Sequence, residues 1–313
     1  MLRRAIVGLL LALVVIIGGA VAWAWAPDRP VDTLKLRWAP PPSQFIAVEG
    51  MQVHLRDEGP RDDPHPIVLL HGTSASLHTW EGWAQQLKAH RRVIRFDMPG
   101  FGLTGPNPSG DYTLGAYVRF VDDVLARLDV KQAVVAGNSL GGEIAWLLAV
   151  HHPDRVAKLV LVDAGGYPFK PEGMPIGFKL ARYSMLRPLM THLLPRQMIV
   201  SSVRSVYGDP GKITPELIDR YYELTLREGN RAALVERFAQ SPIGQYAALV
   251  PQIQQPTLIL WGGRDHLIPP ENARHFAQDI AASRAVMFDD LGHVPQEEDP
   301  VRTLAAIQSF ITF

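Results

Sequence analysis

The chain has 313 residues, with 31 basic and 31 acidic side chains, eleven histidines and no cysteine. Balanced charge argues against nucleic acid as a partner, because a phosphate-binding surface usually needs an excess of Lys and Arg. Without cysteine, the fold cannot depend on disulfides or thiolate metal sites. The histidines show no spacing of the HExxH kind, so no metal site is predicted.

The first predicted element is an apolar membrane helix over residues 1–26. Its uncharged run, Ala5–Ala26, would be roughly 33 Å long as a helix, which is enough to cross the hydrocarbon core of a bilayer. Arg3 and Arg4 predict a cytoplasmic N-terminus, with the rest of the chain on the extracytoplasmic side, which is the periplasm in a bacterium. A cleaved signal peptide is the alternative. We favour an uncleaved anchor, because the run is longer than the apolar region of a signal peptide usually is.

Residues 27–44 are predicted to form a tether between this helix and the globular part. They contain Pro30 and the run Pro40-Pro41-Pro42. Proline fixes φ and removes a backbone donor, so such a segment favours an extended, semi-rigid spacer.

From residue 45 onward, short β-rich runs alternate with amphipathic segments. Several runs are continuously apolar, which is typical of strands covered on both faces by helices. The pattern predicts an α/β fold with a mostly parallel eight-stranded sheet, built from residues 45–166 and 251–313. The predicted strands are Phe45–Val48, Gln52–Arg56, Ile67–Leu70, Val93–Phe96, Ala133–Ala136, Lys158–Val162, Thr257–Trp261 and Ala285–Phe288. The predicted helices are Trp80–His90, Leu114–Leu128, Leu140–His151, Glu271–Ile280 and Val301–Phe310.

Residues 167–250 contain no convincing strand and are predicted to be a helical cap inserted between two core strands. Eleven Lys or Arg side chains against seven Asp or Glu give this segment a net charge of +4. A basic face of this kind can dock on anionic lipid headgroups. A plain solvated surface is the alternative, which we favour.

A Gly-x-Ser-x-Gly motif at residues 137–141 is the strongest functional signal. It follows an apolar strand-like run and opens a helical run. This strand–turn–helix setting is that of a nucleophile elbow, in which the glycines permit a tight turn and the hydroxyl of Ser139 projects above the sheet. The helix start also supplies free backbone N–H groups beside the serine. Ser139 is therefore the predicted nucleophile.

A serine hydroxyl needs a base to remove its proton, and the base needs an acid to orient it. His293 follows the last predicted strand, 28 residues after Asp265, which itself follows the strand ending at Trp261. Both therefore lie at carboxyl ends of strands, where the sites of open α/β sheets form. Asp163, after the strand ending at Val162, is the alternative acid. From that position Asp163 could also reach the histidine, and we favour Asp265.

The backbone N–H groups of Thr73 and Leu140 are the predicted oxyanion hole. Thr73 follows the strand Ile67–Leu70, and Leu140 follows the nucleophile, so the two N–H groups can converge on one oxygen. His71 is interpreted as structural, and Asp97 as an organiser of its own loop.

Taken together, the motifs around Thr73, Asp97, Ser139, Asp265 and His293 resemble those of the α/β-hydrolase fold family over nearly all of residues 45–313. Serine at the elbow differs from haloalkane dehalogenases and epoxide hydrolases, which use aspartate there. The Gly-Asn-Ser-Leu-Gly-Gly sequence is similar to the lid-bearing branch of the family. That branch contains meta-cleavage product (carbon–carbon bond) hydrolases, small esterases and cofactor-free haloperoxidase-like enzymes.

The resemblance to the carbon–carbon hydrolases implies three substrate-binding candidates. Asn138 matches their elbow, and Arg182 and Arg187 are candidates for the cap arginine with which those enzymes bind an acidic dienoate. Two features depart from the pattern. Val294 stands where those enzymes commonly have Trp, and a membrane anchor is atypical of them.

The sequence therefore predicts a serine hydrolase, without a cofactor, that cleaves a small, largely apolar carbonyl substrate through an acyl-enzyme on Ser139. A carboxylic ester is the favoured substrate. The alternatives are a vinylogous diketone acid cleaved at a carbon–carbon bond, and a ligand receptor with slow turnover. The expected partners are the small-molecule substrate and, through the N-terminal helix, the membrane. No pattern in the sequence indicates an oligomeric state.

Overall fold

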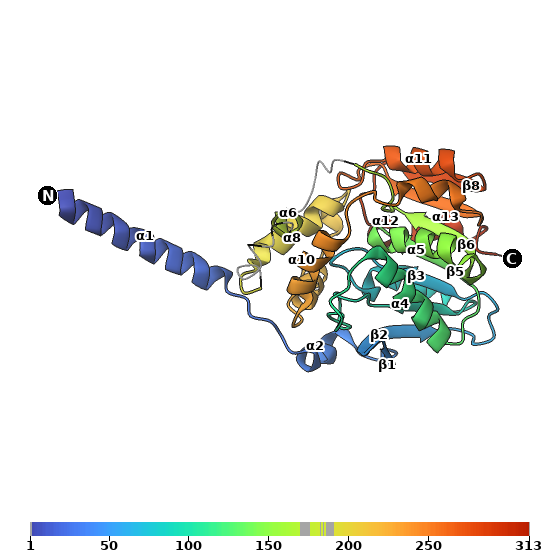
Figure 1. Cartoon of the computed structure of the whole chain (residues 1–313), viewed down its shortest axis with the longest axis horizontal. Coiled ribbons are helices and arrows are strands. Elements are labelled where there is room, and N and C mark those ends of the chain that lie inside the picture. Colours follow the sequence, from blue (N-terminus) through green and yellow to red (C-terminus); the bar gives the residue numbers. More distant parts are fainter. Residues whose placement is uncertain (1, 170–175, 182, 184, 186–190, 313) are drawn as a thin grey trace.

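The centre of the protein is a single sheet with helices on both faces, as the computed structural model shows (Figure 1). The structure describes residues 2–169, 176–181, 183, 185 and 191–312. In this part of the chain, eight strands pair in the order β1-β2-β4-β3-β5-β6-β7-β8, with β2 antiparallel to both neighbours and the others parallel. The predicted α/β fold with a mostly parallel eight-stranded sheet is confirmed. The strands are β1 (Gln44–Val48), β2 (Met51–Glu58), β3 (Ile67–Leu70), β4 (Val93–Phe96), β5 (Ala133–Asn138), β6 (Val156–Val162), β7 (Thr257–Gly262) and β8 (Ser283–Phe288).

Alternate side chains of the inner strands enter two separate cores. In β3, Val68 and Leu70 belong to one core, whereas Ile67 and Leu69 belong to the other. Successive side chains of a strand point to opposite faces, so a strand with a helical layer on each side must be apolar at every position. The first core is covered by α4 (Leu114–Arg127), α5 (Leu140–His151) and α11 (Glu271–Asp279), and the second by η1 (Leu77–Trp80), α3 (Glu81–Leu87) and α13 (Pro300–Ile307).

The segment between β6 and β7 forms the cap, which lies between the core and the N-terminal helix (Figure 1). Val203 and Tyr207 from the cap are buried together with Val294, which follows the predicted base His293. The cap therefore packs directly on the loop that carries this histidine. Its described elements are α6 (Ile176–Ala181), α8 (Arg196–Val206), η4 (Pro210–Lys212), α9 (Pro215–Thr225), α10 (Asn230–Gln240) and η5 (Ala247–Gln252).

The N-terminal helix α1 (Leu2–Ala24) projects away from the rest of the protein (Figure 1). Its stretch Ile6–Ala24 is long and apolar enough to cross a membrane and is exposed along nearly all of its length. The chain that follows is held against the cap. The Ala26 N–H donates to His192 O at 2.9 Å, and the Asp28 carboxylate pairs with Arg231 at 2.6 Å.

The predicted extended spacer contains a helix instead. Residues 31–38 form α2 (Val31–Trp38), which lies between the prolines that favoured extension. Leu34 and Trp38 lie four residues apart on one face of this helix and are buried with Leu103 and Leu224. Trp38 Nε1 also donates to Glu223 Oε2 on α9 at 2.7 Å. The segment is thus attached to the cap and the core, because its two large apolar side chains are buried against apolar residues of both.

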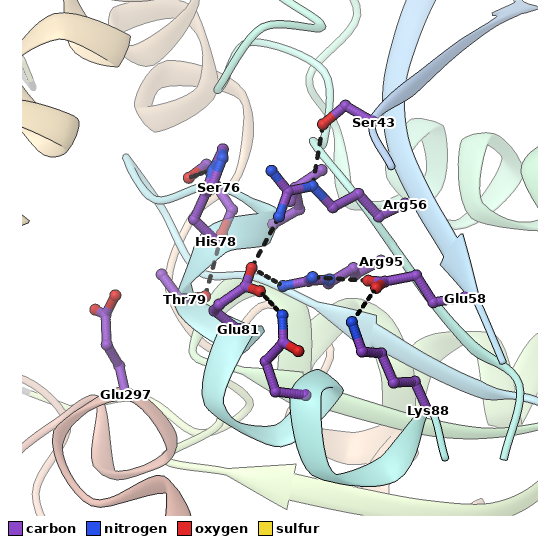
Figure 2. Close-up of polar contacts among 12 residues, drawn as sticks. Ser43, Arg56, Glu58, Ser76, His78, Thr79, Glu81, Lys88, Arg95 and Glu297 are labelled. Carbon is purple, nitrogen blue, oxygen red and sulfur yellow. Dashed lines mark hydrogen bonds and ion pairs between the residues drawn. The ribbon is translucent and has the colours of Figure 1, made fainter. Parts of the chain in front are cut away.

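A network of charged side chains connects the end of this segment to the sheet (Figure 2). Arg56 donates to Ser43 Oγ at 3.0 Å and to Glu81 Oε2 at 2.9 Å. The fully buried Arg95 donates to the same Glu81 oxygen at 2.7 Å and to Glu58 at 2.9 Å. Burial opposes ionisation of Glu81, but the hydrogen bond and charge of Arg95 outweigh it and lower the pKa of Glu81 to about 2. Arg95 therefore holds two carboxylates together inside the protein.

Replacing Arg95 with Met is expected to lower the free energy of unfolding by about 3–5 kcal/mol, because two carboxylates then lose the cation between them. Urea denaturation of the full-length protein in detergent, followed by tryptophan fluorescence, measures this. The control is Arg119→Met, which removes an exposed ion pair with Asp111 and should cost less than about 1 kcal/mol. Equal losses in the two variants would contradict the role of Arg95.

Candidate active site

Ser139 lies at the turn between β5 and α5, with φ at +56° and ψ at −117°. This backbone conformation costs a residue with a side chain about 1–3 kcal/mol, so the surroundings must hold it. The Ser139 N–H donates to Val162 O at 3.0 Å. The motif glycines are required by close backbone approach. A Cβ on Gly137 would lie 2.2 Å from Gly141 O, and one on Gly141 would lie 2.2 Å from Leu70 O.

The buried side chains of His293 and Asp265 contact each other, with Nδ1 of the histidine 2.7 Å from Oδ2 of the aspartate. The other carboxylate oxygen accepts the backbone N–H groups of Leu267 (2.8 Å) and Ile268 (3.0 Å). Hydrogen bonds of this kind stabilise the charged form of a carboxyl group. Asp265 is thus placed to accept a hydrogen bond from Nδ1–H of His293, which leaves Nε2 as the nitrogen that can accept a proton. His293 and Ser139 line the same cavity.

Asp163, the alternative acid, lies beside this pair. One ligand atom each from Asp163, Asp265 and His293 fall within 4.8 Å of one another. Asp163 Oδ1 accepts the N–H of Gly262 at 2.9 Å. Burial, and to a lesser extent the neighbouring Asp265, raise the pKa of Asp163 well above its usual range. The geometry assigns the histidine contact to Asp265.

His71 holds the peptide group between Gly72 and Thr73. Its Nδ1 donates to Gly72 O at 2.7 Å, and its Nε2 accepts the N–H of Met98 at 2.9 Å. Burial lowers the pKa of His71, so the ring is neutral and can act as both donor and acceptor. In a trans peptide the Thr73 N–H points opposite to Gly72 O, so orienting the carbonyl also orients the N–H. Thr73 and Leu140 both line the cavity.

Asp97 organises the neighbouring loops, as the sequence predicted. One oxygen accepts the N–H of Leu77 at 2.8 Å. The other accepts the N–H of Leu103 at 2.8 Å and contacts His54 Nδ1 at 2.8 Å. All of these contacts are buried, so Asp97 joins three segments of chain beside β3, the strand that precedes Thr73.

Asn138 lines the cavity, but its amide is already used inside the protein. Its Nδ2 donates to the carbonyl oxygens of Val162 (3.1 Å) and His293 (2.9 Å). Asn138 therefore connects the elbow to the histidine loop, and only its Oδ1 is left for a substrate. Glu298 supports the same loop by accepting the N–H of Gly292 at 2.8 Å.

The cavity lies under the cap and has a volume of about 360 Å³. Its walls are largely apolar, with Met198, Ile199, Leu234 and Phe238 supplied by the cap helices α8 and α10. Ala24, the last residue of α1, also lines the cavity. The N-terminal helix thus contributes to the wall of the pocket that holds the predicted nucleophile.

Among the described residues, three charged side chains interrupt the apolar lining. Glu143 comes from α5, and Arg231 and Arg237 come from α10. Arg231 is paired with Asp28, as described above. The two cap arginines predicted to bind an acidic substrate, Arg182 and Arg187, lie outside the described residues.

Sequence reasoning missed Glu143, Arg237 and Glu298. Glu143 had a visible signal, because it is the one charged residue in the apolar run 140–150, and a charge in a buried helix requires a reason. Arg237 and Glu298 had no visible signal in the sequence, because their burial depends on how the cap packs against the core.

The sheet topology and the serine at the elbow define a hydrolase with an α/β fold. The model of the alpha/beta hydrolase fold family matches residues 65–300. The chain belongs to this family.

Three known proteins illustrate what this chain is similar to. A 2-hydroxy-6-oxononadienedioate/2-hydroxy-6-oxononatrienedioate hydrolase of Pseudomonas sp. is 31% identical over 272 residues, which is 82% of this chain and 92% of that protein. A meta-cleavage product hydrolase from Pseudomonas fluorescens IP01 has a similar structure, with a TM-score of 0.74 and 22% identity over 85% of this chain and 96% of that one. A bacterial membrane phospholipase A has a TM-score of 0.72 and 24% identity, over 98% of this chain and 97% of that one.

Proposed function

We propose that this protein is a membrane-anchored serine hydrolase that cleaves carboxylic esters with an apolar acyl chain. One observation carries the proposal: the cavity of Ser139 and His293 is largely apolar and extends to Ala24 at the end of α1. An acyl chain in such a cavity gains about 0.8 kcal/mol for each buried methylene group. Ala24 lies where α1 would leave a bilayer, so a lipid-like substrate has a short path from the membrane to the cavity.

The chemistry follows the order of a serine hydrolase. Ser139 attacks the ester carbonyl while Nε2 of His293 takes the hydroxyl proton, and Asp265 stabilises the imidazolium. The backbone N–H groups of Thr73 and Leu140 stabilise the oxyanion. His293 then gives the proton to the leaving alcohol. Water attacks the acyl-enzyme by the same route, which releases the acid and regenerates the serine.

Helix α1 is the proposed anchor, with the catalytic part on the extracytoplasmic side. Trp23 and Trp25 are exposed at its C-terminal end, where an interfacial aromatic belt would lie. Removal of α1 as a signal peptide would also remove Ala24 from the cavity wall. This dependence of the pocket on the helix favours an uncleaved anchor.

A second candidate is hydrolysis of a carbon–carbon bond in a vinylogous diketone acid. The similarity to the Pseudomonas dienedioate hydrolase, at 31% identity, favours it, and Arg237 supplies a cation in the cavity. Val294 and the apolar lining favour the ester instead, because an acidic dienoate gains little from apolar walls.

The test is a direct comparison of the two substrate classes with full-length protein in detergent micelles. We expect 4-nitrophenyl esters from acetate to palmitate to be cleaved, with an optimum at a medium or long chain, and a vinylogous diketone acid to remain intact. Cleavage of the diketone acid without ester turnover would replace the proposed function with the second candidate.

Replacing Ala24 with Phe is expected to move the chain-length optimum to shorter esters, because Ala24 is a buried part of the cavity wall. Loss of space for two methylene groups corresponds to roughly a tenfold fall in kcat/KM for the longest esters relative to the short ones. Ala22→Phe, two residues earlier on exposed helix, is the control and should keep the wild-type profile. An unchanged profile in Ala24→Phe would show that acyl chains do not reach α1.

A further inference from the structure

Glu143 and Arg237 are buried side chains in the cavity wall that the proposed ester cleavage does not use. Glu143 is 7% exposed and Arg237 is 8% exposed. They come from opposite sides of the cavity, since α5 belongs to the core and α10 to the cap. Within the part of the chain that the structure describes, neither side chain makes a hydrogen bond or an ion pair with another residue.

Burying polar groups without partners is unfavourable, so these two side chains require an explanation. Arg237 Nε and Glu143 Oε1 are sealed from the cavity and have no partner. The terminal guanidinium nitrogens and Glu143 Oε2 are therefore the atoms that can reach a molecule in the cavity. Burial raises the pKa of Glu143 to about 7, although the charge of Arg237 opposes the shift. The two groups influence each other electrostatically without contact.

Their position relative to the nucleophile limits what they can bind. Glu143 lies on the first turn of α5, and its backbone N–H donates to Ser139 O at 3.0 Å, so the two residues are close to each other. The neighbouring Gly165 leaves room for the Glu143 carboxyl group, because a Cβ on residue 165 would lie only 2.8 Å from Glu143 Oε2. A group bound here would be a few bonds away from a carbonyl held at Ser139.

We propose that Glu143 and Arg237 form a subsite for a hydroxyl group of the substrate. The inference rests on the proposed ester hydrolysis and names its substrate class, which is esters with a free hydroxyl near the scissile carbonyl, such as monoacylated polyols. A hydroxyl both donates and accepts, so it can donate to Glu143 Oε2 and accept from the Arg237 guanidinium. A carboxylate on the substrate would pair with Arg237 but would be repelled by the negative charge of Glu143. A plain alkyl chain could form a hydrogen bond with neither side chain.

The test compares 1-decanoylglycerol with propyl decanoate, which lacks the two hydroxyls, using full-length protein in detergent. We expect wild type to favour the glycerol ester by about tenfold in kcat/KM, equivalent to about 1.4 kcal/mol. Arg237→Met and Glu143→Leu should each abolish most of this preference. Arg204→Met, an exposed arginine on α8 in the same cap, is the matched control and should keep it.

A second measurement does not depend on turnover. The uncleavable ether 1-O-decylglycerol should bind wild type about tenfold more tightly than Arg237→Met, as measured by calorimetry. If wild type cleaves both esters equally and the ether binds both proteins alike, the subsite is overturned while the proposed function stands. If no ester is cleaved, the proposed function fails and ether binding still decides the subsite. Should Arg237→Met not fold, the isosteric Glu143→Gln takes its place, and an unchanged preference in that variant counts against the subsite.

Discussion

Replacing Ser139 with Ala is expected to lower kcat for ester hydrolysis by roughly a million-fold, because no other group can form the acyl-enzyme. The change should leave stability within about 1 kcal/mol of wild type, since Ala keeps the Cβ and the same backbone strain at φ +56°. Steady-state release of 4-nitrophenol measures the rate. Stopped-flow detection of a burst, present in wild type and absent in the variant, reports the acyl-enzyme itself.

The control is Ser201→Ala, which alters an exposed serine on α8 outside the cavity. It should keep wild-type turnover and the burst. If Ser139→Ala kept more than about one per cent of the wild-type kcat, Ser139 would not be the nucleophile. The oxyanion hole alone sustains a much smaller fraction of the wild-type rate.

Replacing Asp265 with Asn is expected to lower kcat by about ten-thousand-fold. An amide N–H facing Nδ1 of His293 would force the proton onto Nε2, and the imidazole could then no longer accept the serine proton. The Nδ1 contact of 2.7 Å makes this the direct consequence of the substitution. A pH–rate profile measured alongside should also show loss of the imidazolium stabilisation that Asp265 provides.

Asp163→Asn is the matched control, and it should keep kcat within about tenfold of wild type. Burial raises the pKa of Asp163 well above its usual range, which favours its neutral form, so the amide is a close match in shape and its oxygen can still accept the N–H of Gly262. The reverse order of effects, with Asp163→Asn the more damaging, would make Asp163 the acid.

Much of the fold was predictable because its signals are local. A parallel strand buried on both faces must be apolar throughout, and this pattern located the inner strands. The bounds of all eight predicted strands agree with the structure to within about two residues. The elbow was equally local, since a strand, a glycine-rich turn and a helix follow one another within one short segment around Ser139. The placement of Asp265 and His293 at strand ends then followed from the chain order expected in this fold.

The tertiary structure decided what depends on partners distant in sequence. Two aspartates at neighbouring strand ends look alike in the chain. Asp265 accepts two backbone N–H groups and contacts the histidine, whereas burial raises the pKa of the neighbouring Asp163 well above its usual range. The residues expected to form a spacer became α2 because Leu34 and Trp38 meet an apolar surface formed partly by the cap.

The sequence by itself determined the sheet, the nucleophile elbow and the class of chemistry, because backbone propensity and burial on two faces are properties of consecutive residues. Only the tertiary structure decided the shape of the pocket, the inclusion of Ala24 in its wall and the placement of Glu143 and Arg237 in the lining of one cavity. The physical reason is desolvation. The charge state and role of a side chain depend on which groups exclude water from it, and in this protein those groups come from the core, the cap and the N-terminal helix together.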